Sequence, residues 1–270
     1  MLRIAVVTGA SSGMGKEFAV QLAARGIYDE IWMIARRADR LGRIADEINA
    51  LHGCGAAKPV CLDISGKAGA GKFAAMLDSY NAELERSGTG LEIAVMVNNA
   101  GFGTYGPFEE TDTGREMEMV ELNCTALTGI CSAALRYMNS GSILINTASL
   151  ASFLPLGNFA VYGATKAFVL SLSMALAAEL KDRGIKVCAL CPGPVSTEFA
   201  DVASNGARKK VRHGLDAADV VAHCLRKAEK GRHTAIMAFK WKFKAAASRF
   251  IGRYAGARFT YKFCPRPHNP

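Results

Sequence analysis

Three side chains in the middle of the chain are of the types that move protons. Tyr162 and Lys166 lie four residues apart, and the apolar run 168–180 predicts a helix that would place the phenol and the amine on one face. Ser149 lies thirteen residues before Tyr162, at the end of the predicted strand 142–146. Because ligand-contacting groups gather at the carboxyl ends of parallel strands, the set predicts proton exchange with a substrate oxygen.

A glycine-rich turn, residues 8–15, directly follows the apolar run 4–7. A turn between a strand and a helix points unpaired helix N–H groups at an anion, and only glycine lets backbone and phosphate approach closely. The residues that we expect to hold a pyrophosphate here are Gly9, Ser11, Ser12, Gly13, Met14 and Gly15. The alternative is a strand-turn-helix corner that merely needs flexible residues.

The segments after this turn complete a βαβ unit, because helical periodicity from 18 to 27 is followed by a predicted strand at 31–35. An acidic residue usually accepts the adenosine ribose hydroxyls about 20 positions after the glycines. Ala35 occupies that place, and Arg36 and Arg37 follow it. Two guanidiniums favour a 2′-phosphate, so we predict NADP over NAD. The alternative is that both arginines solvate the start of a surface helix.

Taken together and in this order, the motifs resemble those of the short-chain dehydrogenase/reductase family over about residues 3–238. The motifs are the glycine turn, Asp63-Ile64, residues 98–101, Asn123, Ser149, the Tyr162–Lys166 pair and residues 192–197. The resemblance implies an α/β fold of Rossmann type, a doubly wound parallel sheet of six to seven strands within three α/β/α layers. It implies a catalytic domain at 1–238, to which residues 239–270 add a basic aromatic extension.

By this resemblance Tyr162 is the general acid in reduction and the base in oxidation, and Ser149 is the second donor to the substrate oxygen. A phenol with a pKa near 10 needs roughly 4 kcal/mol in favour of phenolate to work near neutral pH. A cation about 4 Å away contributes on the order of 4 kcal/mol at an effective dielectric near 20, so we expect Lys166, helped by an oxidised nicotinamide, to suffice. Asn123 would interrupt a helix and hold a water behind Lys166.

The same resemblance assigns the remaining cofactor contacts. Asp63 would bond the adenine amino group, and Thr197 would reach the nicotinamide carboxamide. The other expected cofactor-binding residues are Ile64, Asn99, Ala100, Gly101, Tyr162, Lys166, Pro192, Gly193 and Val195. Structural alternatives exist for several positions: Ser149 and Asp63 can cap turns, Asn123 can bond the backbone, and Asn98-Asn99 can be purely structural, with Ser152 as a weaker catalytic candidate.

Apolar residues dominate the segments that would line the substrate pocket, Leu150, Phe153, Leu154, Leu156, Phe159 and the expected lid 198–202. A bulky apolar ketone or alcohol, either steroid-like or a long-chain 3-oxoacyl group, suits such a lining better than a sugar. We therefore predict an NADP(H)-dependent oxidoreductase. The alternative is a nucleotide-sensing or membrane-associated binding protein that retains the fold. Family resemblance also predicts a homodimer or homotetramer built from helices around 114–137 and 162–181.

Composition suits one α/β unit of 270 residues, half of them hydrophobic. The N-terminus runs straight into the first strand and we see no apolar run of membrane-spanning length, so we expect a cytoplasmic protein. The eight cysteines lie mostly in apolar runs and are interpreted as reduced packing residues, Cys188 and Cys191 included, with no metal site expected.

Positive charge is concentrated at the C-terminal end. Ten of the 33 Lys and Arg residues follow Glu229, and no Asp or Glu does. Aromatic residues interleave with these cations, and Phe243, Ala247, Phe250, Ile251 and Tyr254 are spaced as one helical stripe. A basic amphipathic helix of this kind can lie on an anionic membrane, where each cation contributes about 1 kcal/mol. The alternatives are a segment that covers the substrate pocket or packs between subunits, and a nucleic-acid patch, which we do not expect.

Overall fold

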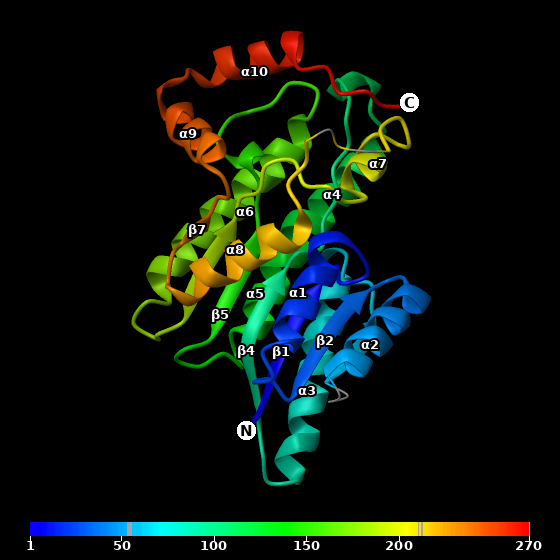
Figure 1. Ribbon diagram of the computed structural model, residues 1–270, viewed down its shortest axis with the longest axis vertical. Helices are drawn as coiled ribbons and strands as arrows, with labels where there is room; N and C mark the ends of the chain where they lie inside the picture. The colour runs from blue at the N-terminus through cyan, green and yellow to red at the C-terminus, as the bar shows by residue number, and fades with distance from the viewer. Residues whose placement is uncertain (53–55, 210, 212, 270) are drawn as a thin grey trace.

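The computed structural model describes residues 1–52, 56–209, 211 and 213–269. Its centre is a seven-stranded parallel sheet in the order β3-β2-β1-β4-β5-β6-β7 (Figure 1). The strands are β1 (Leu2–Thr8), β2 (Glu30–Ala35), β3 (Ala57–Cys61), β4 (Leu91–Asn98), β5 (Ile143–Thr147), β6 (Lys186–Leu190) and β7 (Thr234–Ala235). The predicted Rossmann-type, doubly wound sheet is confirmed.

Helices connect the strands and cover both faces of the sheet (Figure 1). The helices are α1 (Gly13–Ala23), α2 (Ala38–His52), α3 (Gly66–Arg86), α4 (Thr113–Val120), α5 (Leu127–Ala134), α6 (Ala160–Glu179), α7 (Phe199–Ala203), α8 (Ala217–Glu229), α9 (Phe239–Ala247) and α10 (Arg253–Phe263). Shorter helical turns are η1 (Phe108–Glu110), the wide turn η2 (Glu121–Ala126), η3 (Leu150–Ser152) and η4 (Ser248–Phe250).

The core lies in two layers, one on each side of the sheet. Ala5 and Val7 of β1 pack in the layer that contains α1, α2 and α8, whereas Ile4 and Val6 pack with α3, α5 and α6. Successive side chains along a strand point to opposite faces, so a strand covered on both faces must be apolar throughout. The apolar run 4–7 in β1 meets this requirement.

The strand order places a ligand crevice between β1 and β4. The chain winds from β1 outward to β3, then crosses back to β4 and winds in the other direction to β7. Ligands of such sheets bind outside the carboxyl ends of the strands, where the winding direction reverses. The glycine turn after Thr8 and the segment after Asn98 both leave the sheet at this place.

The wide turn η2 carries Asn123 at the predicted interruption of a helix. The Asn123 amide nitrogen donates to the Phe102 carbonyl (3.0 Å) and to Thr165 Oγ1 (3.1 Å), and its oxygen accepts from the Phe102 N–H (3.2 Å). Asn123 thus fastens the loop after β4 to α6, the helix of Tyr162. The backbone bonding that the sequence left as an alternative is what the side chain does.

Helix α6 is long and apolar enough to cross a membrane by length and composition, although Lys166 and several hydroxyl side chains interrupt its apolar run. Its Val169 and Ala177 belong to the core layer shared with α3 and α5. Buried Tyr162, Thr165 and Lys166 also lie on it. Core helices of ordinary α/β proteins can be equally long and apolar, so we interpret α6 as a core helix.

The described cysteines are all free thiols. Cys131, Cys188, Cys191 and Cys224 are buried, as predicted for packing residues. Cys61 is exposed at the end of the edge strand β3, so the packing interpretation is wrong there. Cys54 lies outside the described residues.

Residues 239–269 form a segment that we call the C-terminal arm. Figure 1 shows α9 and α10 at one end of the molecule, beyond the carboxyl ends of the strands. The expected continuous stripe from Phe243 to Tyr254 is wrong, because α9 ends at Ala247 and Ile251 is extended. Thr260 Oγ1 accepts from the Gly157 N–H (2.9 Å), so the arm folds back onto the loop before α6.

Candidate active site

The glycine turn is built so that only glycine fits at its three key positions. Gly9 and Gly13 have φ values of +69° and +52°, a region that side chains with a Cβ rarely adopt. A Cβ on Gly9 would lie 2.9 Å from the Ala100 Cα, and one on Gly15 would collide with the Gly9 carbonyl. Helix α1 starts at Gly13, so its first N–H groups face this narrow turn. The geometry fits an anion-binding turn.

Arg37 lies across the mouth of this turn. Its Nε donates to Ser11 Oγ (3.1 Å), and Nη2 donates to Ser12 Oγ (2.8 Å). Its Nη1 pairs with Glu198 (2.9 Å), which also pairs with Arg40 (2.6 Å). The guanidinium is therefore held at the glycine turn, where a phosphate oxygen would meet it. The two serines predicted for phosphate contact hold Arg37 in place in this structure.

Arg36 and Asp63 line the same end of the cavity. Hydrogen bonds from Ser65 hold the pKa of the Asp63 carboxyl below its usual value, and the nearby Arg36 charge adds a smaller effect in the same direction. Asp63 is thus an ionised acceptor that also caps the turn after β3, because it accepts from the Ser65 N–H (3.0 Å). Both interpretations of this residue are compatible with its position.

Thr8 joins the glycine turn to the segment after β4. Its Oγ1 accepts from the N–H groups of Asn99 (3.0 Å) and Ala100 (3.1 Å) and donates to the Val97 carbonyl (3.3 Å). The Asn99 amide in turn donates to the Thr8 carbonyl (3.2 Å). Asn98 is buried and donates to Asn146 (2.9 Å), so its role is structural, as one alternative held. Thr8 was named only as part of the motif and proves to be its central hydrogen-bonding group.

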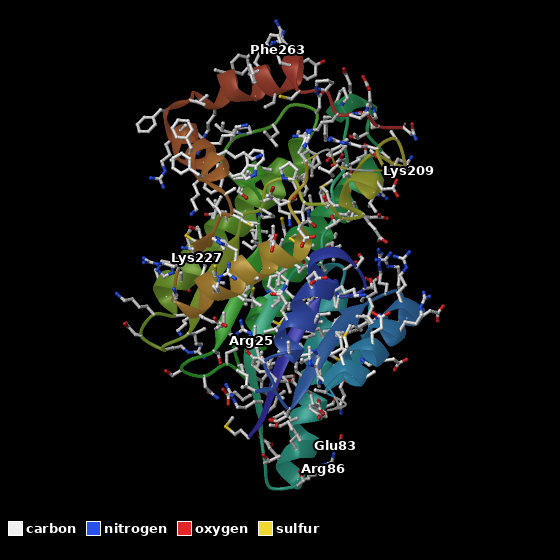
Figure 2. The ribbon with its side chains drawn as sticks, viewed as in Figure 1. Arg25, Glu83, Arg86, Lys209, Lys227 and Phe263 are labelled. Carbon is white, nitrogen blue, oxygen red and sulfur yellow. The ribbon has the colours of Figure 1, made fainter. Side chains whose placement is uncertain are left out.

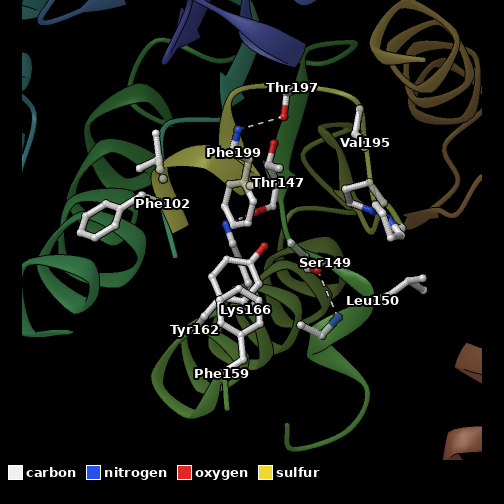
Figure 3. A pocket seen from close by; sticks show the side chains of 18 of the residues that line it. Phe102, Thr147, Ser149, Leu150, Phe159, Tyr162, Lys166, Val195, Thr197 and Phe199 are labelled. Atoms are coloured by element: carbon white, nitrogen blue, oxygen red, sulfur yellow. Dashed lines mark hydrogen bonds between the residues drawn. The ribbon is translucent and has the colours of Figure 1, made fainter. Parts of the chain in front are cut away.

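The three proton-moving residues meet at one place. Figure 3 shows the Tyr162 hydroxyl and the Ser149 hydroxyl facing the same space, with the Lys166 side chain passing beside the phenol ring. Lys166 Nζ lies 5.7 Å from the centroid of that ring and donates to the Thr147 carbonyl (2.7 Å). The spacing read from the sequence therefore brings these side chains together.

Ser149 is fixed by a local hydrogen-bond pattern. Its Oγ accepts from the Ala151 N–H (3.1 Å), and Ser152 Oγ accepts from the Ser149 N–H (3.2 Å), which forms a capping box on η3. Ser152 donates its own proton to the Lys166 carbonyl (2.7 Å). The Ser149 oxygen is held by a backbone donor, and its O–H remains able to point to a ligand. Ser149 caps a turn and also faces the cavity, so the capping interpretation and the catalytic interpretation are compatible. The Ser152 hydroxyl instead bonds to two backbone groups.

Burial dominates the protonation of the pair. It raises the pKa of the Tyr162 phenol to about 12, although the Ser149 hydroxyl and the Arg266 charge act to lower it. Burial likewise lowers the pKa of the Lys166 amine to about 8. The Tyr162 phenol is therefore protonated near neutral pH, and the expectation that Lys166 and an oxidised nicotinamide together favour the phenolate stays a prediction. The amine is hydrogen-bonded to Thr147, and a pKa of about 8 leaves it mostly charged at neutral pH.

One cavity of about 1320 Å³ contains the glycine turn and the proton-moving residues. Apolar side chains of η3, the loop before α6, and α7 line its other end, as expected for the substrate side. Every predicted site residue lines it except Gly15 and Asn123, which support it from behind. The expected substrate lining of Leu150, Phe153, Leu154, Leu156 and Phe159 is also present.

The C-terminal arm contributes residues that sequence reasoning missed. The Arg266 guanidinium stacks 4.5 Å from the Phe159 ring centroid and 5.1 Å from that of Tyr105. Trp241 packs on Gly193, where a Cβ would lie 2.7 Å from the indole. Phe159 stacks on Tyr162, with ring centroids 4.1 Å apart. The signal in the sequence was the aromatic-basic composition of the arm, for which covering the substrate pocket was one open alternative. Ile251, Phe259 and Arg266 line the cavity, in agreement with that alternative.

Comparisons with known proteins agree with this geometry. Residues 3–207 match the family described as short chain dehydrogenase. Two similar proteins are a 17-beta-hydroxysteroid dehydrogenase type 3 of Mus musculus (31% identical, 74% of this chain and 63% of that protein) and a very-long-chain 3-oxoacyl-CoA reductase of Neurospora crassa (31%, 73% and 58%). A similar solved structure is a short-chain dehydrogenase from Sphingobium yanoikuyae in complex with NADPH, with a TM-score of 0.77 at 26% identity, covering 92% of this chain and 94% of that one.

Proposed function

Because the chain belongs to the short-chain dehydrogenase/reductase family, we propose that it is an NADP(H)-dependent oxidoreductase that interconverts a ketone and a secondary alcohol on a bulky apolar substrate. The observation that carries the proposal is the meeting of the Tyr162 and Ser149 hydroxyls in one largely apolar cavity with the glycine turn. A protein that only senses a nucleotide would need the turn but not the two converging hydroxyls.

The residues present fit the cofactor. Gly9, Gly13 and Gly15 leave no room for a Cβ against Ala100, Thr197 and the Gly9 carbonyl, so the turn keeps the tight shape that brings backbone N–H groups to a pyrophosphate. Arg36 and Arg37 line the cavity where an adenosine phosphate would lie. Thr197 packs on Gly13, because a Cβ there would come within 3.0 Å of its methyl group. When bound, NADP(H) supplies or accepts the hydride. The preference for the phosphorylated form rests on the two arginines.

Reduction of a ketone requires a hydride at the carbonyl carbon and a proton at its oxygen. With a pKa of about 12, the Tyr162 phenol is protonated near neutral pH, which is the form a proton donor needs. The Tyr162 O–H bond breaks as the substrate oxygen takes the proton, while the Ser149 O–H donates a hydrogen bond to the same oxygen. In oxidation the phenolate must form first, and the Lys166 amine beside the ring favours it while that amine is charged, below its pKa of about 8.

The substrate class follows from the wall opposite these hydroxyls. Leu150, Leu156 and Phe159 line the cavity together with Phe199 and Val202 of the predicted lid segment. Such a wall excludes water and binds a large apolar body, and it has few groups to pair with sugar hydroxyls. Steroid-like ketones and long-chain 3-oxoacyl groups both suit it, in line with the names of the two similar proteins.

The test is turnover by the full-length protein with NADPH and NADH against steroid ketones, 3-oxoacyl thioesters and keto sugars, followed as loss of reduced nicotinamide. We expect activity on members of the first two groups. Tyr162→Phe should abolish it, since a phenyl ring cannot exchange a proton, whereas the matched change Tyr254→Phe on the exposed face of the arm should not. Full activity of Tyr162→Phe with an unchanged pH profile would refute the assigned acid.

A further inference from the structure

The C-terminal arm carries charge of one sign. Between Phe239 and Phe263 it has seven cations, Lys240, Lys242, Lys244, Arg249, Arg253, Arg258 and Lys262, and no Asp or Glu occurs in this stretch. All seven side chains are exposed. A cation-rich helical surface attracts an anionic one, and the attraction is strong only within about 10 Å at ordinary salt. The arm is thus complementary to a partner with a dense negative surface.

The same stretch exposes large apolar side chains. Phe250 is 90% exposed, Phe239 82% and Tyr254 81%. Phe243, Ile251, Phe259, Tyr261 and Phe263 are exposed as well. Figure 2 places Phe263 at one end of the molecule, with Arg86 at the opposite end. Soluble surfaces rarely gather so many large apolar groups in one short segment unless something covers them.

Most of these exposed groups take no part in holding the arm on the body of the protein. Its inward positions are the buried Ala245, Ser248 and Gly256, together with Trp241 against Gly193 and Thr260 against Gly157. Phe243, Lys244, Ile251 and Phe259 are partly exposed and also line the cavity, whereas Phe239, Phe250, Tyr254, Phe263 and the other six cations lie outside its lining. The outer surface is free to meet a second partner.

We propose that the outer surface of the C-terminal arm docks on an anionic phospholipid bilayer, with its cations at the headgroups and its exposed aromatic rings inserted at the interface. Aromatic and cationic side chains together are the composition of helices that lie in the membrane interface. A nucleic acid would use the cations but leave the phenylalanines uncovered. A second copy of the arm would cover the phenylalanines but bring seven cations against seven.

The position of the arm connects this docking surface with the cavity. Its inner residues Ala247, Ile251 and Phe259 line the cavity that holds Tyr162. One short element therefore touches both the proposed bilayer and the apolar end of the cavity. A substrate dissolved in the bilayer would find the cavity next to the surface on which the enzyme sits.

The experiment is co-sedimentation of the full-length protein with vesicles, read as the bound fraction. Vesicles of phosphatidylcholine with phosphatidylglycerol should bind it at low salt, and vesicles of phosphatidylcholine alone should bind it far less. Replacing Lys240 and Lys242 by Gln should weaken binding about 30-fold, as the loss of two cations predicts. Phe250→Ser with Tyr254→Ser should weaken it at least about tenfold, because two interfacial rings are lost.

Matched controls lie outside the arm. Leu51→Ser removes an apolar side chain that is 76% exposed, and Lys67→Gln with Arg86→Gln removes two exposed cations outside the arm. Both controls should bind anionic vesicles as the parent protein does. The readout needs no turnover, so it is independent of the proposed reaction.

Three results would overturn the proposal. The first is no difference between anionic and neutral vesicles at low salt. The second is an equal loss of binding in the arm variants and in the controls outside the arm. The third is self-association in sedimentation velocity that Phe250→Ser with Tyr254→Ser abolishes, without vesicle binding by the parent, which would assign the surface to a second copy.

Discussion

Replacing Arg37 by Ala should selectively weaken the binding of NADPH. The guanidinium is fixed at the glycine turn by Ser11 and Ser12, so it needs little reorganisation to meet a 2′-phosphate. A hydrogen bond to a charged group contributes about 1.5–3 kcal/mol, which corresponds to roughly 10- to 160-fold in the dissociation constant. NADH lacks the phosphate, so its affinity should change little.

Glu198 reduces this gain, because it pairs with Arg37 and Arg40. These partners are close to half exposed, and such pairs contribute about 0.2–1 kcal/mol each. A phosphate must replace or share the Glu198 contact with Arg37. Glu198→Gln should therefore bind NADPH up to about fivefold more tightly, the opposite direction to Arg37→Ala.

The assay is titration of each variant with NADPH and NADH, reported as the ratio of the two dissociation constants. Arg43→Ala, which removes an exposed arginine of α2, is the matched control and should leave the ratio unchanged. If Arg37→Ala also leaves it unchanged, Arg37 does not read the phosphate. A fall in affinity of the same size for both cofactors would instead assign Arg37 to the shape of the turn.

Three further outcomes follow from the site. Because burial raises the pKa of Tyr162 to about 12, kcat/KM for alcohol oxidation should rise with pH through the alkaline range. The kcat/KM for ketone reduction should not change with pH near neutrality. Measuring oxidation and reduction over a series of pH values checks both outcomes. The Lys166 pKa is lowered from 10.5 to about 8, so the folded protein binds fewer protons than the unfolded chain between those two pH values. The unfolding free energy should therefore rise with pH across that window, by on the order of 3 kcal/mol in all. Urea denaturation should show this rise in the parent protein but not in Lys166→Met. Gly193→Ala should displace Trp241 and loosen the arm, seen as faster proteolysis of the C-terminal segment at unchanged global stability, and unchanged proteolysis would contradict the packing.

Local patterns in the sequence predicted most of the sheet and the catalytic set. The apolar runs at β1 and β2 are buried on both faces of the sheet. A strand that is covered on both faces has apolar residues at successive positions, and this pattern is visible in the sequence. The positions of Gly9, Gly13 and Gly15 predicted the turn because backbone conformation restricts the first two to glycine and close packing against the Gly9 carbonyl restricts the third. Ser149 and Tyr162 were found because strand ends and helix spacing are both local properties.

Long-range docking and protonation could not be predicted in this way. Arg266 is 104 positions from Tyr162 in the sequence, and no periodicity tells that its guanidinium stacks on Phe159. The stripe from Phe243 to Tyr254 suggested one helix, yet the chain breaks after Ala247 so that the arm can turn over the cavity. The high pKa of Tyr162 results from burial by Phe159, Phe199 and the arm, which only the assembled fold supplies.

The hydroxyl of Ser152 ties η3 to the backbone of α6, so the two elements that carry Ser149 and Tyr162 are joined without help from α7 or the C-terminal arm. Part of the substrate wall comes from these last two segments, which lie elsewhere in the chain. Mutations can therefore accumulate in those two segments and alter what is recognised while the proton donors keep their alignment. Descendants of such a protein can acquire new substrates, and new surfaces on which to work, without reinventing the reaction.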